Sequence, residues 1–405
     1  MSIDFVAPPF AGHLFPLLEL GRRLRERGMT SLRMVSTPDV AETIRLSGIT
    51  PVDLLPGRAD EVWAIANTGR QVVLHPLRIY RQVRANMALM ADAAAQLRAT
   101  WSEQRPDLVI ADFTVPVAGL VARSMGIRWW TSMPTPCALE TKSGTPAYLG
   151  GWTPPSTPMG RARDALGRRA VSLFKRGGAA MFRPELRAIG LSGVYREDGS
   201  EAVYSDECIL ALGMRELEFE RDWPAALHFV GPLTESPPFP HAAPSFDERP
   251  AILVTLGTHL PWARERADAL VRDLAAQMPD CLFHLAMGAP GSNVRQTDGN
   301  VHRYGFIPYD RYLHRYRAAV IHGGTGILYA CIQAGVPMLI WPHDYDQHDH
   351  AARIVARGLG LRLRPRSAAR DLRSLLTGDS IRTRVRDFQR MSMSYDPGRW
   401  VAEHL

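Results

Sequence analysis

The segment "HGGTGILYACIQAGVPMLIWPHDYDQ", residues 322–347, carries the strongest structural signal in this chain. It begins with a histidine and a glycine-rich turn, continues as a helical run, and passes through Gly-Val-Pro into a hydrophobic strand. A bare turn before a helix leaves the first backbone N–H groups of that helix uncovered, and the helix dipole makes this end positive. The segment therefore predicts a helix followed by a strand, with an anion site at the start of the helix.

The sequence on both sides of this segment alternates between short apolar runs and stretches with helical spacing. In the second half, "AILVTLGT" (251–258) and "CLFHLAMG" (281–288) have strand character, and "WARERADALVRDLAAQM" (262–278) has helical periodicity. The first third repeats the pattern, with "SIDFVAPP" (2–9) and "PDLVIADF" (106–113) as strands. This alternation predicts right-handed βαβ units, and therefore an α/β fold of two Rossmann-like domains with parallel sheets.

A proline-rich stretch separates the two alternating regions. Residues 231–250 hold six prolines and show no periodicity, which is typical of an interdomain linker. We therefore predict an N-terminal domain over residues 1–232, a linker over 233–249 and a C-terminal domain over 250–385. Residues 386–405 are expected to form a helix that packs back on the N-terminal domain. Ligands bind at the carboxyl ends of parallel strands, so we expect the chemistry in a central cleft between the domains.

The composition is that of an ordinary soluble globular protein. No apolar run is long enough to span a membrane, and the N-terminus lacks the basic and apolar regions of a signal peptide. These features predict a cytoplasmic protein. The four cysteines are scattered without a C-x-x-C pair, which argues against a zinc ribbon or a redox pair.

The net charge of +7 comes mainly from arginine, and residues 161–187 hold eight basic side chains against two acidic ones. Such a basic stretch with aliphatic spacing could contact anionic lipid or nucleic acid, although a solvated helix face is the commoner explanation. No zinc finger or aromatic RNA-binding motif accompanies it, so a nucleic-acid partner is not expected. Peripheral contact of residues 161–187 with a membrane therefore stays an alternative. The sequence does not indicate the oligomeric state.

Two residues of the N-terminal half suggest acid–base chemistry. His13 follows Gly12 at the end of the first predicted strand, where it could act as a general base or simply bond to the backbone. Asp112 ends another strand, where it could orient the imidazole of His13 or serve as a turn acid before the next helix. No G-x-S-x-G nucleophile motif is present. A His–Asp pair without a nucleophile suggests a base that activates a hydroxyl of the substrate itself.

The opening segment suggests how a phosphate group would be held. His322, Gly324, Thr325 and Gly326 join a strand to a helix and could hold a diphosphate, or could form a tight turn without a ligand. The turn is not a Walker loop, because no Gly-Lys-Ser/Thr follows, and it does not match G-x-G-x-x-G. Gly257-Thr258, at the end of the strand at 251–258, could add contacts to the same anion or form a plain turn.

The end of the segment suggests sugar recognition. An adjacent acid and amide, Asp346-Gln347, suit binding of vicinal hydroxyls, although Asp346 could equally cap the next helix. The histidines and aspartates between residues 343 and 350 match no standard zinc or calcium spacing. We therefore expect no metal and no cofactor.

With these motifs in place, the chain resembles the GT-B glycosyltransferases of family 1, the UDP-glycosyltransferase type, over essentially its full length. "AGHLFPLLELGRRLRERG" resembles the family's G-H-x-x-P start, "PDLVIADF" its V-x-D-x-F segment and "ILVTLGT" its S-x-G-S/T loop. "HGGTGILYACIQAGVPMLIWPHDYDQ" aligns without a gap to the donor signature H-C/G-G-x-N-S/T…G-V-P…P…D-Q. The resemblance implies that His13 is the catalytic base and that Asp112 orients it.

The resemblance also implies roles for the donor loop. His322, Gly324 and Gly326 would hold the diphosphate of a nucleotide sugar, and Asp346 and Gln347 would bind hydroxyls of its sugar. The family inverts the anomeric carbon and needs no metal. Members of the family include macrolide, zeaxanthin and plant natural-product glycosyltransferases.

Several positions depart from the family pattern, and they concern the nucleotide. Gly326-Ile327 replaces the usual Asn and Ser/Thr, and Ala330 replaces the ribose-binding Glu of plant enzymes. The choice between a UDP and a dTDP donor therefore stays open. Tyr304 stands where plant enzymes have a base-stacking Trp, so Tyr304 and Ile307 are the candidate nucleobase contacts.

These observations predict an inverting, metal-independent transfer of a sugar, a hexose such as glucose, from a nucleoside diphosphate sugar to an acceptor hydroxyl. The aromatic residues of segments 60–90 and 129–195 suggest a small apolar or aromatic acceptor, of natural-product or lipid-like character. Several of these rings could instead be core, above all Trp129 and Trp130. Two alternative functions remain: a nucleotide-sugar 2-epimerase of the same fold, and a nucleotide-sugar-binding protein without catalysis.

Overall fold

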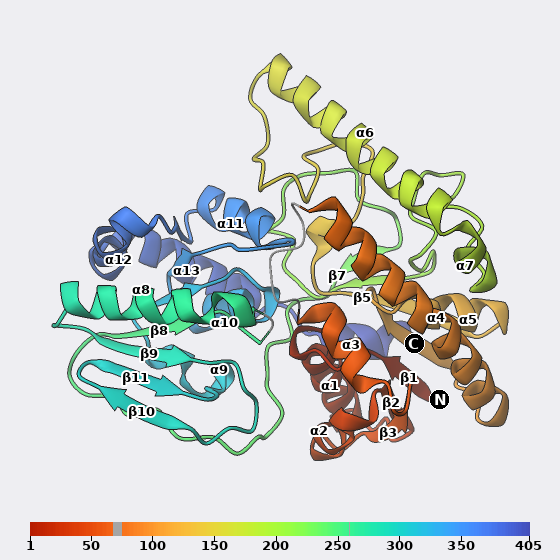
Figure 1. Cartoon of the computed structure of the whole chain (residues 1–405), viewed down its shortest axis with the longest axis horizontal. Coiled ribbons are helices and arrows are strands. Elements are labelled where there is room, and N and C mark those ends of the chain that lie inside the picture. Colours follow the sequence, from red (N-terminus) through yellow and green to blue (C-terminus); the bar gives the residue numbers. More distant parts are fainter. Residues whose placement is uncertain (68–74, 259) are drawn as a thin grey trace. The chain divides into compact units, whose positions relative to one another are not determined.

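The computed structural model of the chain describes residues 1–67, 75–258 and 260–405. They form two compact units, each considered by itself (Figure 1). Of the described residues, the first unit comprises 1–66, 75–231 and 396–405. The second comprises residue 67 and residues 232–258 and 260–395. Each unit is built on a seven-stranded sheet, so the predicted α/β class with two Rossmann-like units is confirmed.

The sheet of the first unit is parallel throughout, in the order β3-β2-β1-β4-β5-β6-β7. The strands are β1 (Ile3–Val6), β2 (Leu32–Ser36), β3 (Thr50–Asp53), β4 (Leu108–Asp112), β5 (Arg128–Met133), β6 (Ile209–Ala211) and β7 (Leu227–Phe229). Every residue of β1 and β4 is buried, as expected for central strands that are covered on both faces.

Helices cover this sheet and include two long ones, α4 and α6. They are α1 (Ala11–Glu26), α2 (Ala41–Leu46), α3 (Ala59–Ala66), α4 (Pro76–Glu103), α5 (Pro116–Ser124), α6 (Pro158–Met181), α7 (Arg183–Ala188) and α14 (Pro397–His404), with short 3₁₀ turns η1 (Pro38–Val40) and η2 (Pro136–Ala138). No helix among the described residues is long and apolar enough to cross a membrane.

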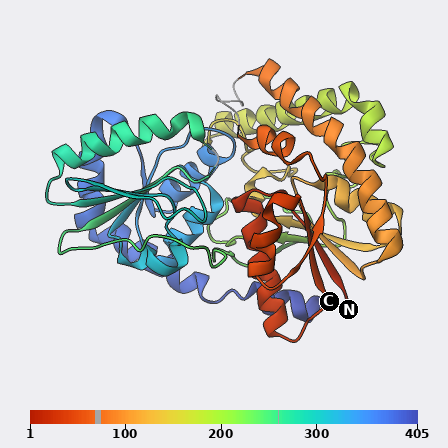
Figure 2. The ribbon, with the colours of Figure 1, turned by 60° about the horizontal axis from the view of Figure 1, so that its bottom comes forward.

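The second unit has the strand order β10-β11-β9-β8-β12-β13-β14, and only the β10–β11 hairpin at its edge is antiparallel. Its strands are β8 (Ala251–Thr255), β9 (Leu282–Ala286), β10 (Arg295–Asp298), β11 (Val301–Tyr304), β12 (Ala318–Ile321), β13 (Met338–Ile340) and β14 (Gly360–Arg362). Its helices are α8 (Arg264–Gln277), α9 (Tyr309–Tyr312), α10 (Thr325–Ala334), α11 (Gln347–Ala356), α12 (Ala368–Thr377) and α13 (Asp379–Ser392), with η3 (Pro261–Ala263), η4 (Leu313–Arg315) and η5 (Pro365–Ser367). Figure 2 shows the helices of this unit on both faces of its sheet.

The C-terminal end returns to the first unit later than the sequence suggested. We expected residues 386–405 to form the returning helix, but α13 extends to Ser392 and packs on α10 of the second unit. The chain joins the first unit only from Asp396, where α14 packs on α1. An ion pair of 2.7 Å between Arg27 and Asp396 fixes the start of α14.

The proline-rich segment 233–249 has no helix or strand, and it packs along the second unit. Phe239 meets the ring of Phe306 edge to face, with ring centroids 5.8 Å apart. The backbone N–H of Ser245 donates to the Tyr304 hydroxyl at 2.9 Å. The segment is therefore held to the second unit by side-chain contacts along much of its length.

Candidate active site

His13 and Asp112 meet at the carboxyl edge of the first sheet. Strand β4 lies beside β1 with Ala111 opposite Val6, so the end of β4 approaches the helix that begins at Ala11. His13 Nδ1 lies 3.0 Å from Asp112 Oδ1. The Asp112 side chain is fully buried, whereas 23% of the His13 side chain is exposed. The carboxylate accepts the Nδ1–H, so the ring presents Nε2 as its other nitrogen, the tautomer a general base requires.

Asp112 also has the turn role that the sequence left open. Its Oδ1 accepts the backbone N–H of Thr114 at 2.9 Å and the hydroxyl of the same residue. The N-cap of α5 is Val115, which makes no side-chain capping bond, so Asp112 holds the turn before α5 without capping it. These bonds fix the carboxylate that orients His13.

Aromatic rings surround the imidazole of His13. The ring of Phe113 lies 5.6 Å from it between centroids, and that of Phe10 lies 6.2 Å away. Trp63 packs edge to face on Phe10 at 5.3 Å, and its indole N–H donates to Asp39 at 2.7 Å. All three rings are half-buried, so they form an apolar surface beside the partly exposed base.

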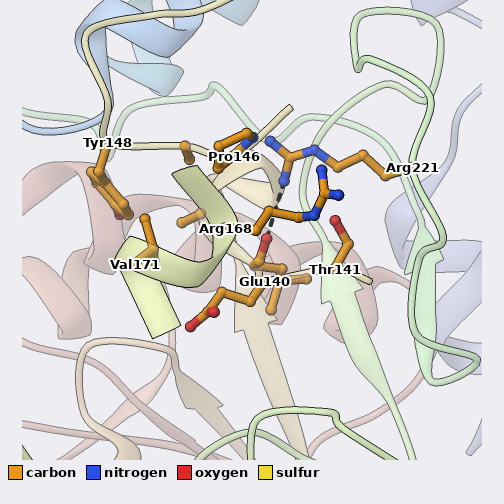
Figure 3. A pocket seen from close by; sticks show the side chains of 10 residues that line it. Glu140, Thr141, Pro146, Tyr148, Arg168, Val171 and Arg221 are labelled. Carbon is orange, nitrogen blue, oxygen red and sulfur yellow. Dashed lines mark hydrogen bonds between the residues drawn. The ribbon is translucent and has the colours of Figure 1, made fainter. Parts of the chain in front are cut away.

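A narrow pocket lies in the same unit between residues 138–148 and the inner face of α6. Arg221 donates to the carbonyls of Leu139 at 3.0 Å and Thr145 at 2.5 Å. Figure 3 shows the guanidinium groups of Arg168 and Arg221 close together, with Tyr148 on the opposite side. The pocket therefore combines two cationic groups with an aromatic wall.

The aromatic residues singled out between 129 and 195 have different surroundings. Trp129 and Trp130 are buried in the core, as the alternative interpretation held. Tyr148 lines the pocket, and Trp152 is covered by the Arg163 guanidinium at 4.6 Å from its centroid. Phe174 is exposed on α6. Only Tyr148 of this group therefore contributes a ring to the pocket.

In the second unit, three of the predicted diphosphate residues lie together. A Cβ added at Gly257 would come 2.7 Å from Cε1 of His322, and one added at Gly324 would overlap Nε2 of the same ring. The His322 ring therefore packs directly against two glycine backbones. Gly257 has a φ of +69°, a conformation that favours glycine.

The first turn of α10 is bare. Gly324 is the N-cap and makes no side-chain capping bond, and Thr325, Gly326 and Ile327 form the first turn. A Cβ added at Gly326 would meet nothing within 4 Å, so the space beside this backbone is open. An uncapped helix start next to a histidine ring and open space provides the features of an anion site.

Asp346 and Gln347 begin α11, and their side chains differ in their bonding. Asp346 is the N-cap residue but makes no side-chain capping bond, so the predicted capping alternative does not hold. The Gln347 carbonyl oxygen accepts the backbone N–H groups of His343 at 2.9 Å and Asp344 at 3.2 Å. Tyr345, the residue before Asp346, has a φ of +53°, which is uncommon for a residue with a side chain. The loop is thus tightly specified around Asp346.

Comparison with known proteins finds glycosyltransferases that resemble this chain. Residues 274–389 match the family described as the erythromycin biosynthesis protein CIII-like C-terminal domain. The chain is 25% identical to the zeaxanthin glucosyltransferase of Pseudescherichia vulneris over 395 residues, which cover 94% of this chain and 91% of that protein. The glycosyltransferase of kitacinnamycin superposes with a TM-score of 0.73 at 22% identity, covering 98% of this chain and 96% of that one. The chain is a glycosyltransferase of the GT-B type, related to family 1.

A further solved relative contains a nucleotide. The Streptomyces sp. SF2575 glycosyltransferase SsfS6, complexed with thymidine diphosphate, superposes with a TM-score of 0.66 at 17% identity. It covers all of this chain, and 99% of its own chain is matched. Its fold therefore extends over both units of the present glycosyltransferase.

The two nucleobase candidates of this glycosyltransferase are buried. Tyr304 is 0% exposed and Ile307 is 1% exposed. The ring of Tyr304 packs edge to face on His284 at 5.1 Å, and its hydroxyl accepts the N–H of Ser245. Linker residue Ser245 and His284 of β9 contact the Tyr304 side chain. The nucleobase role of Tyr304 and Ile307 stays a prediction, and both side chains are buried in this structure.

His350 of α11 was not predicted as a site residue, yet it connects the two halves of the donor loop. Its Nδ1 donates to the carbonyl of Gly323 at 2.7 Å, and its Nε2 lies 4.0 Å from Asp346 Oδ2. The side chain is almost fully buried. His350 follows Asp346 at the i,i+4 spacing of one helix face, and that spacing is the sequence signal that could have identified it.

His343 lies in the same loop and stays neutral. Burial, followed by the charge of Arg266, lowers its pKa to about 4. Its ring packs against Trp341 at 4.6 Å and Trp262 at 5.6 Å between centroids. Across the described part of the chain, no three histidine, cysteine or acidic side chains cluster as metal ligands would.

A buried charge cluster beside the pocket was also missed. Lys175 of α6 pairs with Glu140 at 2.8 Å and with Glu201 at 2.5 Å. Burial acts to lower the pKa of Lys175, but the charges of Glu201, Tyr204 and Glu140 outweigh it and raise the pKa. The cluster fastens α6 to the loop that forms the pocket wall. No motif indicates it, because its members lie far apart in the sequence.

Proposed function

We propose that this glycosyltransferase moves a sugar from a nucleoside diphosphate sugar to a hydroxyl of an apolar or aromatic natural-product acceptor, with inversion and without a metal or cofactor. The observation that carries the proposal is the 3.0 Å bond between His13 and the buried Asp112. A histidine held by a buried carboxylate, with no nucleophilic motif in the chain, suits proton removal from a substrate hydroxyl.

The chemical step follows from that tautomer. Nε2 of His13 takes the proton of the acceptor hydroxyl while the hydroxyl oxygen forms a bond to the anomeric carbon. The bond from that carbon to the diphosphate oxygen breaks, and the nucleoside diphosphate leaves with the electron pair. Asp112 keeps Nδ1 protonated and stabilises the imidazolium that forms. A single displacement of this kind inverts the anomeric configuration.

The glycine-rich loop would receive the leaving group. Backbone N–H groups of Thr325 and Gly326 and the dipole of α10 would stabilise the diphosphate, with the His322 ring beside them. Gly257 and Thr258 would add backbone and hydroxyl contacts from the end of β8. In this position the partial positive charge of the backbone N–H groups would stabilise the leaving diphosphate, as a divalent metal does in other transferases.

Asp346 and Gln347 would bind the transferred sugar. The Asp346 carboxylate makes no capping bond, so it can accept hydroxyl hydrogens, and the Gln347 amide retains its N–H groups as donors. A hexose such as glucose fits this pair of groups, and the relative named a glucosyltransferase supports that choice. The relative solved with thymidine diphosphate and the small Ala330 both support a dTDP donor beside UDP.

The acceptor would lie against the rings around His13. Phe10, Trp63 and Phe113 provide an apolar surface at the base, and one relative is named a zeaxanthin glucosyltransferase.

A donor panel followed by an acceptor screen tests the proposal. UDP- and dTDP-glucose are ranked by thermal shift, and the better donor is incubated with phenolic, macrolide and carotenoid alcohols. We expect an acceptor-linked sugar of inverted configuration by NMR, and its loss in His13→Ala. An epimerised sugar formed from donor alone would instead indicate a 2-epimerase, and tight donor binding without any product would indicate a non-catalytic binding protein.

A further inference from the structure

The outer face of α6 is the most apolar exposed helix surface among the described residues. Five of its large apolar side chains are at least three-fifths exposed: Met159, Leu166, Leu173, Phe174 and Met181. Such side chains on one helix amount to an uncovered apolar face, which monomeric proteins usually avoid.

The opposite face of α6 is firmly packed. Asp164 and Gly167 are buried, and a Cβ added at Gly167 would come 2.7 Å from the Trp152 ring. Lys175 is held by Glu140 and Glu201 on this inner side. Because the inner face is anchored and tight, the exposed leucines of the outer face are a fixed surface of the first unit. Figure 1 shows α6 as a long helix at the outside of that unit.

The spacing confirms that the exposed apolar residues share one face. Met159, Leu166 and Leu173 follow one another at intervals of seven residues, which is close to two helical turns. Arg169 and Arg176 are exposed and lie seven residues apart along one flank of this row. The row is thus an apolar stripe bordered by arginines.

The charge of this face has a single sign. The only acid of α6, Asp164, is buried and paired with Arg163 at 2.7 Å. Arg161, Arg169 and Arg176 are exposed, and no acidic side chain of α6 accompanies them. The partner that complements this face must therefore be negatively charged and able to accept apolar side chains along the helix.

The apolar surface continues onto α4. Tyr80 stacks on Phe182, which follows α6, with centroids 5.8 Å apart and the rings inclined by 25°. Leu77, one turn before Tyr80, is 74% exposed, and Arg81 and Arg84 are exposed as well. The N-terminal turns of α4 repeat the combination of apolar and arginine side chains.

We propose that the outer face of α6, with the start of α4, binds the surface of an anionic membrane. A helix of 24 residues extends about 36 Å, and an anionic headgroup layer over an apolar interior complements its whole length. Arginines reach headgroup phosphates while their stems and the neighbouring leucines enter the acyl boundary. A second copy of the chain complements the face poorly, because pairing α6 with itself would oppose arginines to arginines.

The place of α6 in the fold gives this binding a use. Because α6 belongs to the unit that carries His13, an apolar acceptor dissolved in the bilayer would be presented next to that unit. This use rests on the proposed function, whereas membrane binding itself does not depend on it.

Vesicle sedimentation of the full chain tests the binding. Vesicles of phosphatidylcholine alone are compared with vesicles that contain phosphatidylglycerol, at low and at high salt. We expect pelleting only with the anionic vesicles, reversed by salt because arginine–headgroup attraction is screened. Leu166→Ser/Leu173→Ser should lower the partition coefficient roughly tenfold or more, since two large apolar side chains no longer enter the interface.

Two matched variants complete the design. Arg169→Gln removes an exposed charge and should weaken the salt-sensitive part of the binding. Met391→Ser/Met393→Ser removes two exposed apolar side chains of the second unit and should leave pelleting unchanged. All variants are compared with the parent chain by circular dichroism and by glycosyl transfer to a water-soluble acceptor, which these surface changes should not alter.

Two outcomes would overturn the proposal. One is absence of pelleting with anionic vesicles at low salt, or pelleting that Leu166→Ser/Leu173→Ser does not reduce. The other is a concentration-dependent dimer by light scattering that the same variant abolishes, because the face would then bind a second copy. Failure of either kind leaves the transfer assay untouched, so it is distinguishable from failure of the proposed function.

Discussion

In the first unit, His13 of α1 and Asp112 at the end of β4 are 99 residues apart, whereas in the second unit residues 322–350 contain nearly all of the candidate donor-binding residues. The first site depends on two side chains that meet because β1 and β4 are neighbours in register. The second depends on backbone: an uncapped helix start, glycines with open space and a helix N-cap. A side-chain site should fail when a functional group is removed, and a backbone site when space is filled.

The largest effect is expected at the side-chain site. His13→Ala removes the base, and we expect kcat to fall by about 10²–10⁴ with the donor affinity nearly unchanged. Asp112→Asn should lower kcat as well, because the carboxylate no longer fixes the tautomer or stabilises the imidazolium. Initial rates and donor binding by calorimetry measure both. His314→Ala, at an exposed histidine of the second unit, is the control. Near-normal turnover in His13→Ala would show that another group takes the proton.

The backbone site is tested by adding a methyl group where it would contact a bound ligand but no protein atom. A Cβ at Gly326 meets nothing of the protein, so Gly326→Ala should keep or slightly raise the melting temperature. If a diphosphate approaches this backbone, the same change should weaken binding of UDP or dTDP by roughly tenfold, about 1.4 kcal/mol.

Gly177→Ala is the matched control, since its Cβ also meets nothing, but it lies on the outer part of α6. Nucleotide affinity should be unchanged there. Equal nucleotide affinity in Gly326→Ala and the parent chain would show that the diphosphate does not approach Gly326. The second unit would then not hold a backbone site of the kind described above.

The contrast between the units also shows what the sequence could reveal. The strand–helix alternation predicted the fold, and the segment 322–347 placed His322 beside Gly324 because a local motif carries its own geometry. Gly257 joins them because β8 and β12 are neighbouring strands. The burial of Tyr304 was not predicted, because it involves Ser245 of the linker, a contact that no local pattern encodes.

The same reasoning explains the residues that were overlooked. Lys175 is paired with Glu140 and Glu201 through the folding of a long loop onto α6, so its partners cannot be read from spacing. His350 did have a readable spacing to Asp346, but its bond to the Gly323 carbonyl appears only when the turn is folded. Within the backbone site, then, the supporting side chains are the part that requires a structure.

His350 allows that support to be tested. His350→Ala removes the bond to the Gly323 carbonyl and the neighbour of Asp346, so we expect binding of the nucleotide sugar to weaken roughly three- to tenfold. His350→Asn retains a donor near the position of Nδ1 and should restore most of the affinity. Calorimetry with the nucleotide sugar and with the free nucleotide distinguishes an effect on Asp346, which would bind the sugar, from an effect on the turn at Gly323, which would bind the diphosphate. Equal losses in the Ala and Asn variants would show that the bond to Gly323 is not what matters.

The smallest effect concerns stability in acid, and it is expected in the second unit. Burial, followed by the charge of His302, lowers the pKa of His284 to about 4, well below the ordinary value near 6.5. Between these values the unfolded chain binds the proton more readily than the folded one, so stability falls as the pH is lowered from about 6.5 towards 4. We expect the second unit to lose a few °C of melting temperature between pH 7.5 and pH 5. His284→Asn should reduce that loss, because the amide can still reach the Tyr316 hydroxyl that lies 2.8 Å from Nδ1 while the titrating ring is gone. Calorimetric scans at the two pH values measure this loss of melting temperature. An identical loss in the variant would mean that other groups set the acid stability of the second unit.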